Sequence, residues 1–488
     1  MSTMGSFLPI AVPATVPTIL ASTILVALFL LILRGIYHVY FSPLSSIPGP
    51  WYAAVSEIWI LVHTLRCRKV RAIDDLFKAY GPVVRIAPTT IAFLDKDHEQ
   101  QTTRLVYNAL KLDKGPLYDM VHMNGHLHSV AIIEHSVHAK YRRIFSSHYS
   151  PGNIALLHPD MKASAELLVQ KVLEAKDRPL DIFPGIHLVM IDLILKSTFG
   201  HDQGALEAWS EHSHDIIMSA IEDYGRLILI QGIVPDWLFG VVRRFPNKRW
   251  QTFCSSGDTL FNTMAEFVRE QQKEKDAGRM DERDKPTLIE RFFAHNATCA
   301  PADRLSFEDM TSESMTHLLA GVDASAVAVA YILWRFASQP LSVKQKIQAE
   351  LDSAMPDAGM HFSKKDCGFT VQSLLSSNVL HLKVGLLICW GTSFQQAPSL
   401  EFDVFRWLDS DQPQDAMLQA WAPYGLGTRI CIGQHLARGA IKTVLAALLR
   451  NFDVLPFPET NDESMEMMEL FGMFPVGLSC KLNFRSRA

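Results

Sequence analysis

The sequence lacks cysteines in the pattern of a disulfide framework. Its seven cysteines lie at positions 67, 254, 299, 367, 389, 431 and 480, so they are odd in number and widely scattered. A disulfide-stabilised secreted domain has an even number of cysteines at closer spacings. We therefore expect no structural disulfides and place the folded part of the chain in a reducing compartment.

An excess of positive charge is also missing. The 488 residues include 46 Lys and Arg against 51 Asp and Glu, which gives a formal net charge of −5. No basic patch interleaved with aromatic residues, the pattern typical of nucleic-acid binding, occurs along the chain. We expect no nucleic-acid partner, and the length is sufficient for a large hydrophobic core.

The beginning of the chain has no charged side chain before Arg34. Residues 16–33 are nearly all apolar, and with Ile36 and Tyr37 the run is long enough to span a bilayer. A cleaved signal peptide is the alternative, but the run has no positive n-region before it and no small-residue cleavage site after it. Because the positive charges follow the run, we predict an N-terminal membrane anchor over residues 1–40, with the body in the cytosol.

The segment after the anchor, residues 41–51, is rich in proline. Its prolines stiffen the chain and stop a helix, which predicts a hinge between membrane and globule. Residues 71–80 then predict a short helix that ends at Gly81, and residues 83–86 and 90–94 predict a β-hairpin.

A cysteine loop, residues 421–433, is the most informative stretch of the chain. Cys431 lies in this glycine-rich loop, directly before a run from Gln434 to about Leu449 with an apolar stripe of helical period. The N-terminus of a helix favours a thiolate over a thiol. Gly427 and Gly433 permit a positive φ and a close approach to a large flat group. Arg429 is placed to pair with a carboxylate of the same ligand.

This loop resembles the cysteine loop of the cytochrome P-450 superfamily. Gly427, Arg429, Cys431 and Gly433 match at the family's spacing, and Tyr424 takes the place usually held by phenylalanine. The resemblance implies that Cys431 is the axial ligand of a haem (heme) iron. A buried structural cysteine is the alternative. The case for a zinc site is weaker still, because no second Cys/His pair with ligand spacing accompanies the cysteine.

Residues 115–138 contain five histidines, which we interpret mainly as scattered loop residues rather than as a metal cluster. His138 is the exception. It forms His-x-x-x-Arg with Arg142 on a predicted helix, so the two side chains share one face. The pair resembles the family's helix that holds a haem propionate; an ordinary basic helix surface is the alternative.

A long helix is predicted over about residues 306–339, with Ser306 and Asp309 as a capping box and Pro340 after its end. Ala320 and Gly321, in its middle, allow a flat cofactor to lie close, although Ala-Gly also suits plain helix packing. Asp323 and Ser325 supply an acid and a hydroxyl for proton relay. The stretch resembles the family's distal helix, with Ala324 in place of the usual threonine.

One family motif is missing. A Glu-x-x-Arg helix is expected after the distal helix, but neither Glu350 nor Glu401 has Arg at the third position after it, and the only acid that does is Asp403, before Arg406 itself. Arg406, in the segment 402–408, matches the arginine that normally pairs with this motif. We interpret the difference as a deletion, an alternative splice or a mistranslated junction.

The resemblance covers about residues 40–485 and implies a mainly α fold with small β-sheets (α+β), with the catalytic domain over residues 41–488. It implies a membrane-anchored haem-thiolate monooxygenase, similar to fungal members of secondary metabolism. Such an enzyme takes electrons from an NADPH-dependent reductase at the endoplasmic reticulum membrane and oxidises a hydrophobic small molecule. The implied residues are Asp323 and Ser325 for catalysis, and Cys431, Arg429, His138, Arg142, Tyr424, Gly427, Gly433, Ala320 and Gly321 for the cofactor.

Two alternatives stay open. A haem enzyme that rearranges or dehydrates its substrate without consuming O₂ would explain Ala324. A degenerate member without catalytic activity would explain the missing Glu-x-x-Arg. A formal glycosylation sequon at Asn296 is expected to be unused if the body is cytosolic.

Overall fold

The computed structural model describes residues 15–94, 105–107, 111–115, 118, 121, 123, 125–176, 178–210, 215–279, 285–354, 423–470 and 472–487. The chain forms two compact units, Met1–Leu94 and Asp95–Ala488. The predicted anchor boundary at residue 40 lies within the first unit and stays a prediction.

The first unit begins with the predicted apolar helix. Helix α1 spans Thr15–Ile36 and continues into a π-helical turn, η1, Tyr37–Phe41. The run Ala21–Phe41 has a mean hydropathy of 2.1 and only 6% of it is buried, so this helix is apolar enough to cross a membrane. Helices α2 (Trp51–Val55), α3 (Ile58–Leu65) and α4 (Lys69–Tyr80) follow, and then the antiparallel hairpin β1 (Val83–Ala87) and β2 (Thr90–Phe93). The predicted helix and hairpin are thereby confirmed.

Arg85 of β1 ties the proline-rich segment to the hairpin. Its side chain is 3% exposed and donates hydrogen bonds to the carbonyls of His38, at 2.7 Å, and Pro88, at 2.5 Å. Its backbone N–H donates to the Pro48 carbonyl at 2.8 Å. A Cβ on Gly49 would lie 2.6 Å from the Arg85 carbonyl, so this close approach requires glycine.

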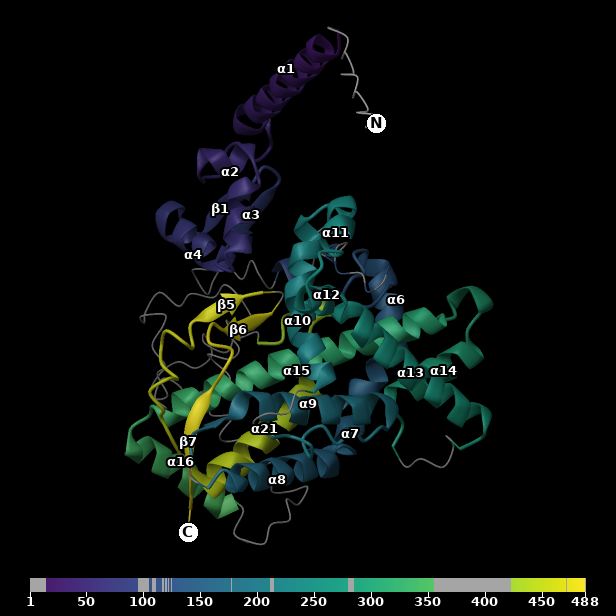
Figure 1. Cartoon of the computed structure of the whole chain (residues 1–488), viewed down its shortest axis with the longest axis vertical. Coiled ribbons are helices and arrows are strands. Elements are labelled where there is room, and N and C mark those ends of the chain that lie inside the picture. The colour runs from purple at the N-terminus through teal and green to yellow at the C-terminus, as the bar shows by residue number, and fades with distance from the viewer. Residues whose placement is uncertain are drawn as a thin grey trace, which may run out of the picture. The chain divides into compact units, whose positions relative to one another are not determined.

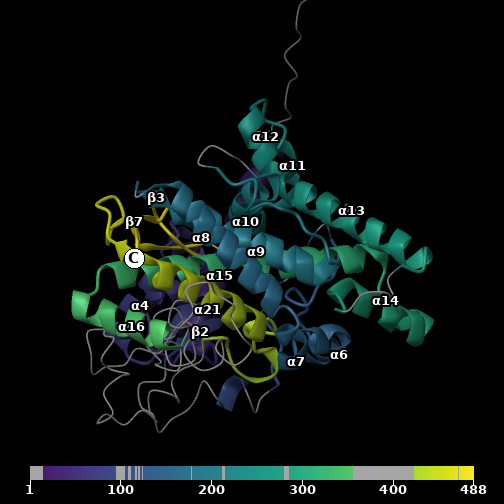
Figure 2. The same cartoon turned by 90° about the horizontal axis from the view of Figure 1, so that it is seen from below.

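The second unit is mainly helical (Figures 1 and 2). Its helices are α6 (His135–Phe145), α7 (Pro151–Ala155), α8 (His158–Glu174), α9 (Ile182–Phe199), α10 (Ile216–Ile233), α11 (Asp236–Val242), α12 (Lys248–Cys254), α13 (Ser256–Asp276), α14 (Leu288–Thr298), α15 (Phe307–Ala337), α16 (Leu341–Ala354) and α21 (Gln434–Asn451). Short 3₁₀ turns are η3 (Ser146–Tyr149), η5 (Pro301–Asp303) and η6 (Gly427–Arg429).

The long helix α15 confirms the predicted distal helix within two residues at each end. Ser306 Oγ accepts from the Asp309 N–H, and Asp309 Oδ2 accepts from the Ser306 N–H, both at 3.0 Å, so the predicted capping box forms. Helix α21 confirms the helix predicted after the cysteine loop and ends two residues later than expected.

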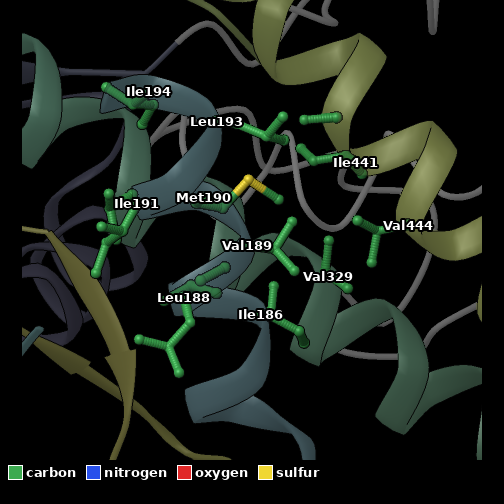
Figure 3. Close-up of a cluster of buried hydrophobic side chains, with 14 of the residues drawn as sticks. Ile186, Leu188, Val189, Met190, Ile191, Leu193, Ile194, Val329, Ile441 and Val444 are labelled. Atoms are coloured by element: carbon green, nitrogen blue, oxygen red, sulfur yellow. The ribbon is translucent and has the colours of Figure 1, made fainter. Parts of the chain in front are cut away.

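The core lies where α9, α15 and α21 pack together. Figure 3 shows side chains of α9 between Ile186 and Ile194 meeting Val329 of α15 and Val444 of α21. Helix α9 and the stretch that contains α15 are also long and apolar enough to cross a membrane, but 89% and 72% of their apolar windows are buried inside the protein. Their composition is therefore that of core helices.

Small sheets complete the second unit. Strand β7 (Lys481–Ser486) lies between β3 (Leu180–Asp181) and β4 (Phe452–Leu455), and β5 (Met467–Glu469) pairs with β6 (Met473–Pro475); all these pairings are antiparallel. Together with the helices, they confirm the predicted class, mainly α with small β-sheets.

Candidate haem-thiolate site

The cysteine loop is shaped by two glycines and one backbone hydrogen bond. Gly425 and Gly427 have φ of +77° and +67°, in the left-handed region that favours glycine. The Cys431 N–H donates to the Tyr424 carbonyl at 2.8 Å, which closes the loop before α21. Gly433 does not use the positive φ that glycine permits: its φ is −77°, because it already occupies the N-cap position of α21.

The Cys431 side chain is accessible, although it lies deep among protein atoms. Burial raises the pKa of the Cys431 thiol above its usual value, while a hydrogen bond from the Gly433 N–H and the charges of Arg142 and Arg438 act in the opposite direction. The helix N-terminus thus supports a thiolate as predicted, but in the protein alone burial outweighs it. A cation bound to the sulfur would reverse this balance.

Four basic residues, Lys114, His138, Arg142 and Arg429, form a cation cluster near this loop. Helix α6 brings His138 and Arg142 together on one face, as predicted. Burial, reinforced by the charges of Arg429, Arg142 and Lys114, lowers the pKa of His138 to about 4. Burial, reinforced by Arg429, lowers the pKa of Lys114 to about 8. A bound anion would relieve the part of each shift that the neighbouring positive charges cause.

The hydrogen bonds of the cation cluster leave donors available. Arg429 donates to the carbonyls of Ile132 and Ile133 at 2.9 and 2.6 Å, and Lys114 Nζ donates to the Val130 carbonyl at 2.6 Å. Within the described ranges, however, Arg429 Nε and His138 Nδ1 are buried without a hydrogen-bond partner. These buried, unpartnered polar atoms fit a ligand that carries carboxylates.

The middle of α15 presents an accessible face of small residues. Ala320 and Ala324 are exposed, although the rest of this helix is largely buried. Gly321 packs toward α9, where an added Cβ would lie 2.5 Å from Ile194 Cδ1. At about 100° per residue, Asp323 lies about 60° from Ala320 around the helix, while Ser325 lies about 140° away. Ser325 is accordingly buried, and Asp323 stands at the rim of the accessible face.

A buried hydrogen-bond network joins α15 to the segments that carry the cation cluster. Glu313 accepts from the backbone N–H and the hydroxyl of Ser129, at 2.7 and 2.5 Å, and pairs with His317 Nε2 at 2.8 Å. His317 Nδ1 lies 2.6 Å from the hydroxyl of Tyr149, which in turn packs toward Gly433. The network holds η3 and the residues before α6 in place against α15.

Several residues of the site were not predicted from the sequence. Lys114 follows no motif, and its place depends on how residues 111–115 pack against residues 130–133. Arg438, whose guanidinium lies 4.7 Å from the centre of the Tyr424 ring, is visible in the sequence only as a polar position of α21. Tyr149 and His317 are far apart in sequence, and only the fold shows that they are partners.

Some predicted features lie outside the described residues: Trp421, Ala422, His122, Arg406 with its segment 402–408, and the stretch from 355 to 400 in which Glu-x-x-Arg was sought. Among the described histidines, His128 Nε2 contacts the Val121 carbonyl at 2.6 Å, and His126 stacks on Phe261. Asn296 of the sequon exchanges two hydrogen bonds with the backbone of Leu305, at 2.8 and 2.9 Å.

An accessible cysteine before a core helix, a group of basic residues beside it and a long helix with a small-residue face together fit a haem-thiolate protein. The cytochrome P450 family model matches residues 48–367 and 396–482, and the chain belongs to this family. The unmatched residues 368–395 fall within the stretch that lacks Glu-x-x-Arg. Membership confirms the predicted family, its haem cofactor and its monooxygenase class.

Curated relatives are fungal cytochrome P450 enzymes. The chain is 24% identical to tryprostatin B 6-hydroxylase of Aspergillus fumigatus, over 91% of this chain and 80% of that protein. It is 23% identical to the cytochrome P450 monooxygenase tazI of Aspergillus terreus, over 94% and 98%. It is also 23% identical to the cytochrome P450 monooxygenase gsfF of Penicillium aethiopicum, over 90% and 94%. The predicted resemblance to fungal members is thereby confirmed.

Proposed function

We propose that Cys431 is the axial ligand of the haem iron in this chain and that the cation cluster holds the propionates. The observation that carries the proposal is the accessible Cys431 thiol, which a Gly433 N–H and two arginines support in a loop with the family's spacing. Bound haem supplies dioxygen activation, and thiolate ligation favours O–O cleavage. Arg429, Arg142 and Lys114 would neutralise the two carboxylates, and His138, which its low pKa keeps neutral, would help to orient them.

On the distal side, the residues of α15 have distinct roles in the proposal. Ala320 has a small side chain on the accessible face, so that the macrocycle and a substrate can lie close to the helix. Gly321, also predicted to contact the cofactor, instead packs toward α9. Asp323 stands at the rim of this face and would deliver protons during oxygen activation. Ser325 is the second predicted relay group; because it is buried, its hydroxyl would act only through Asp323 or through water.

The substrate is proposed to be a hydrophobic small molecule of fungal secondary metabolism. The name of the first relative cited states a hydroxylation of tryprostatin B, which supports this class without fixing the substrate of this chain. The apolar, exposed helix α1 supports anchoring in the endoplasmic reticulum membrane with the catalytic domain in the cytosol. An NADPH-dependent reductase of that membrane would supply the electrons.

The test is the absorption spectrum of the reduced, carbon-monoxide-bound protein. We expect the red-shifted Soret band of a thiolate-ligated haem in the full-length protein. Cys431→Ala should abolish it, while the matched variant Cys299→Ala, at the end of α14, should retain it. A red-shifted band of unchanged intensity in Cys431→Ala would contradict the proposed ligand. Folded full-length protein without any haem band would favour the degenerate alternative.

A second candidate is a rearrangement or dehydration on haem that consumes no O₂. The exposed side chain of Ala324 favours this candidate, because the accessible face of α15 has no hydroxyl at the position where the family usually has threonine. Product formation under strictly anaerobic conditions would support this candidate, and strict dependence on O₂ and NADPH would exclude it.

A further inference from the structure

Asp323 faces a buried histidine of the neighbouring core helix. His187 of α9 has a side chain that is 2% exposed, and its Nε2 lies 3.5 Å from Asp323 Oδ1. The Asp323 side chain is 18% exposed, so it borders both the buried histidine and the accessible face of α15. Asp323 Oδ1 is itself buried, and no described residue lies in hydrogen-bonding geometry to it; the 3.5 Å contact with His187 Nε2 is too long or too poorly aligned.

The second ring nitrogen of His187 fixes the protonation of this pair. His187 Nδ1 lies 2.9 Å from the carbonyl of Phe183, one turn earlier in α9. A carbonyl only accepts hydrogen bonds, so Nδ1 carries a proton. Nε2 of a neutral ring would then present a lone pair to the Asp323 carboxylate, which is repulsive. A second proton must therefore lie between Nε2 and Oδ1, on one atom or the other.

We propose that His187 is a positioning residue that holds this shared proton for Asp323 and thereby supplies the acid at the accessible face of α15. The inference rests on the proposed role of Asp323 and extends it to a residue outside the cysteine loop and the distal helix. The step is a proton transfer from Nε2 to Oδ1, followed by release from Asp323 toward the accessible face. The pair then takes a new proton from water through Asp323, its partly exposed member, and His187 Nε2 is protonated again. Electrons and oxygen come from the established monooxygenase chemistry.

The charged and polar groups around His187 agree with a retained proton. Asp323 faces it from α15, the Phe183 carbonyl from its own helix, and Glu222 acts on it electrostatically from α10. Burial lowers the pKa of His187, but these three groups outweigh burial and raise it above 6.5. Glu222 is exposed and interacts electrostatically with both members of the pair.

The functional test uses oxygen reduction, because it needs no substrate. The holoenzyme is supplied with O₂, NADPH and an NADPH-dependent P450 reductase, and peroxide is measured per NADPH consumed. Two electrons and two protons yield H₂O₂, whereas four of each yield two H₂O, so poor proton delivery shifts the products toward peroxide. We expect His187→Gln and Asp323→Asn each to lower water formation at least about tenfold, because positioned acid–base groups contribute on the order of a hundredfold or more. The double variant should lose no more than Asp323→Asn alone.

His148→Gln is the matched control. His148 is also buried and also contacts α9, with its Nε2 2.9 Å from the hydroxyl of Ser197, but it does not belong to the pair. It should leave the ratio of peroxide to water unchanged. If Asp323→Asn changes the ratio and His187→Gln does not, the role of His187 is refuted while the proposed function stands. If neither variant changes it in protein with a normal carbon-monoxide spectrum, the roles of both residues are refuted.

A second measurement is independent of turnover. The thermal stability of the wild type, the two single variants and the double variant forms a double-mutant cycle, measured at about pH 6 and about pH 9. A histidine with a raised pKa stabilises the fold below its unfolded pKa and loses this effect as the pH rises through its folded pKa. The coupling free energy between His187 and Asp323 should therefore be large at the lower pH and shrink at the higher pH.

Zero coupling at both pH values would overturn the proposal, even if no haem is bound. Because Asp323 is partly exposed, Asp323→Asn is expected to fold even if His187→Gln does not, and its difference from the wild type must show the same pH dependence.

Discussion

Glu313 is a carboxylate without exposed surface, and its neighbours explain why the protein tolerates it. Burial raises its pKa, but the hydrogen bond and charge of His317 and the hydrogen bond from Ser129 outweigh burial, so the net pKa is lowered. A group whose folded pKa is lowered contributes stability above its unfolded pKa and loses it as the pH falls through the folded value. The network therefore stabilises the fold at neutral pH and weakens in acid.

The buried network predicts how the stability of the fold changes when the negative charge of Glu313 is removed. Glu313→Gln should destabilise the fold at pH 7 by on the order of 3–5 kcal/mol, because His317 and Ser129 keep their buried donors without the carboxylate. Urea unfolding monitored by circular dichroism measures this difference. Glu308→Gln, an exposed position on the same helix, should change stability by less than about 0.5 kcal/mol. Equal effects of the two variants would show that the buried network contributes nothing specific.

At this scale, the sequence predicted the residues that belong to local motifs. Cys431, Arg429 and Gly427 follow from their spacing in one loop, and His138 with Arg142 from one helical turn. Gly433 does not use the positive φ that glycine permits, because it is the N-cap residue of the helix that begins at Gln434. Lys114, Tyr149 and His187 were not predicted, since each acquires its role from a partner far away in the sequence.

Among the elements, α9 shows how closely the core helices are fitted. Gly185, two residues before His187, lies against the indole of Trp209, and a Cβ there would come within 2.6 Å of the ring. The ring is rigid and buried, so it cannot yield as a flexible side chain would. Gly225 of α10 is also helical but has nothing within 4 Å of an added Cβ.

The two glycines should respond oppositely to alanine. Gly185→Ala should destabilise the protein by about 1–3 kcal/mol through overpacking. Gly225→Ala should stabilise it by up to about 1 kcal/mol, because alanine favours the helix and restricts the unfolded chain. Chemical denaturation of both variants measures the difference. Stabilisation by both substitutions would mean that Trp209 is free to move.

Element boundaries were predictable where the signals are local. The capping box at Ser306 and the proline at 340 fixed α15 to within two residues, and Gly81 fixed the end of α4. By contrast, α6 has no N-capping side chain of its own. Its first N–H, at His135, donates to Asp113 at 2.7 Å, a residue 22 positions earlier, which no local pattern indicates.

At the scale of the whole molecule, the exposed apolar helix and the positive charges after it support the proposed membrane orientation. Residues before the helix should face the lumen, and the second unit should face the cytosol. The structure also bears on the sequon at Asn296. Both the nitrogen and the oxygen of the Asn296 side-chain amide form hydrogen bonds with Leu305, so the amide is not free to carry a glycan in the folded protein.

This orientation predicts a glycosylation pattern in a eukaryotic host. Met4→Asn, which creates an acceptor sequon with Gly5 and Ser6, should add one glycan that a glycosidase removes. The native sequon at Asn296 should stay unmodified in the same protein. Mobility on a denaturing gel before and after the glycosidase distinguishes the cases. A glycan at Asn296 together with none at position 4 would invert the assigned orientation.

Arg85 has a mechanical consequence. Its guanidinium binds the His38 carbonyl, at the end of the apolar helix, and the Pro88 carbonyl of the β1–β2 hairpin. The helix and the hairpin are therefore expected to move as one rigid body. A tilt of the helix then turns the hairpin with it. Because bilayer thickness influences the tilt of such helices, the same protein should present its hairpin at a different angle in thin and thick membranes.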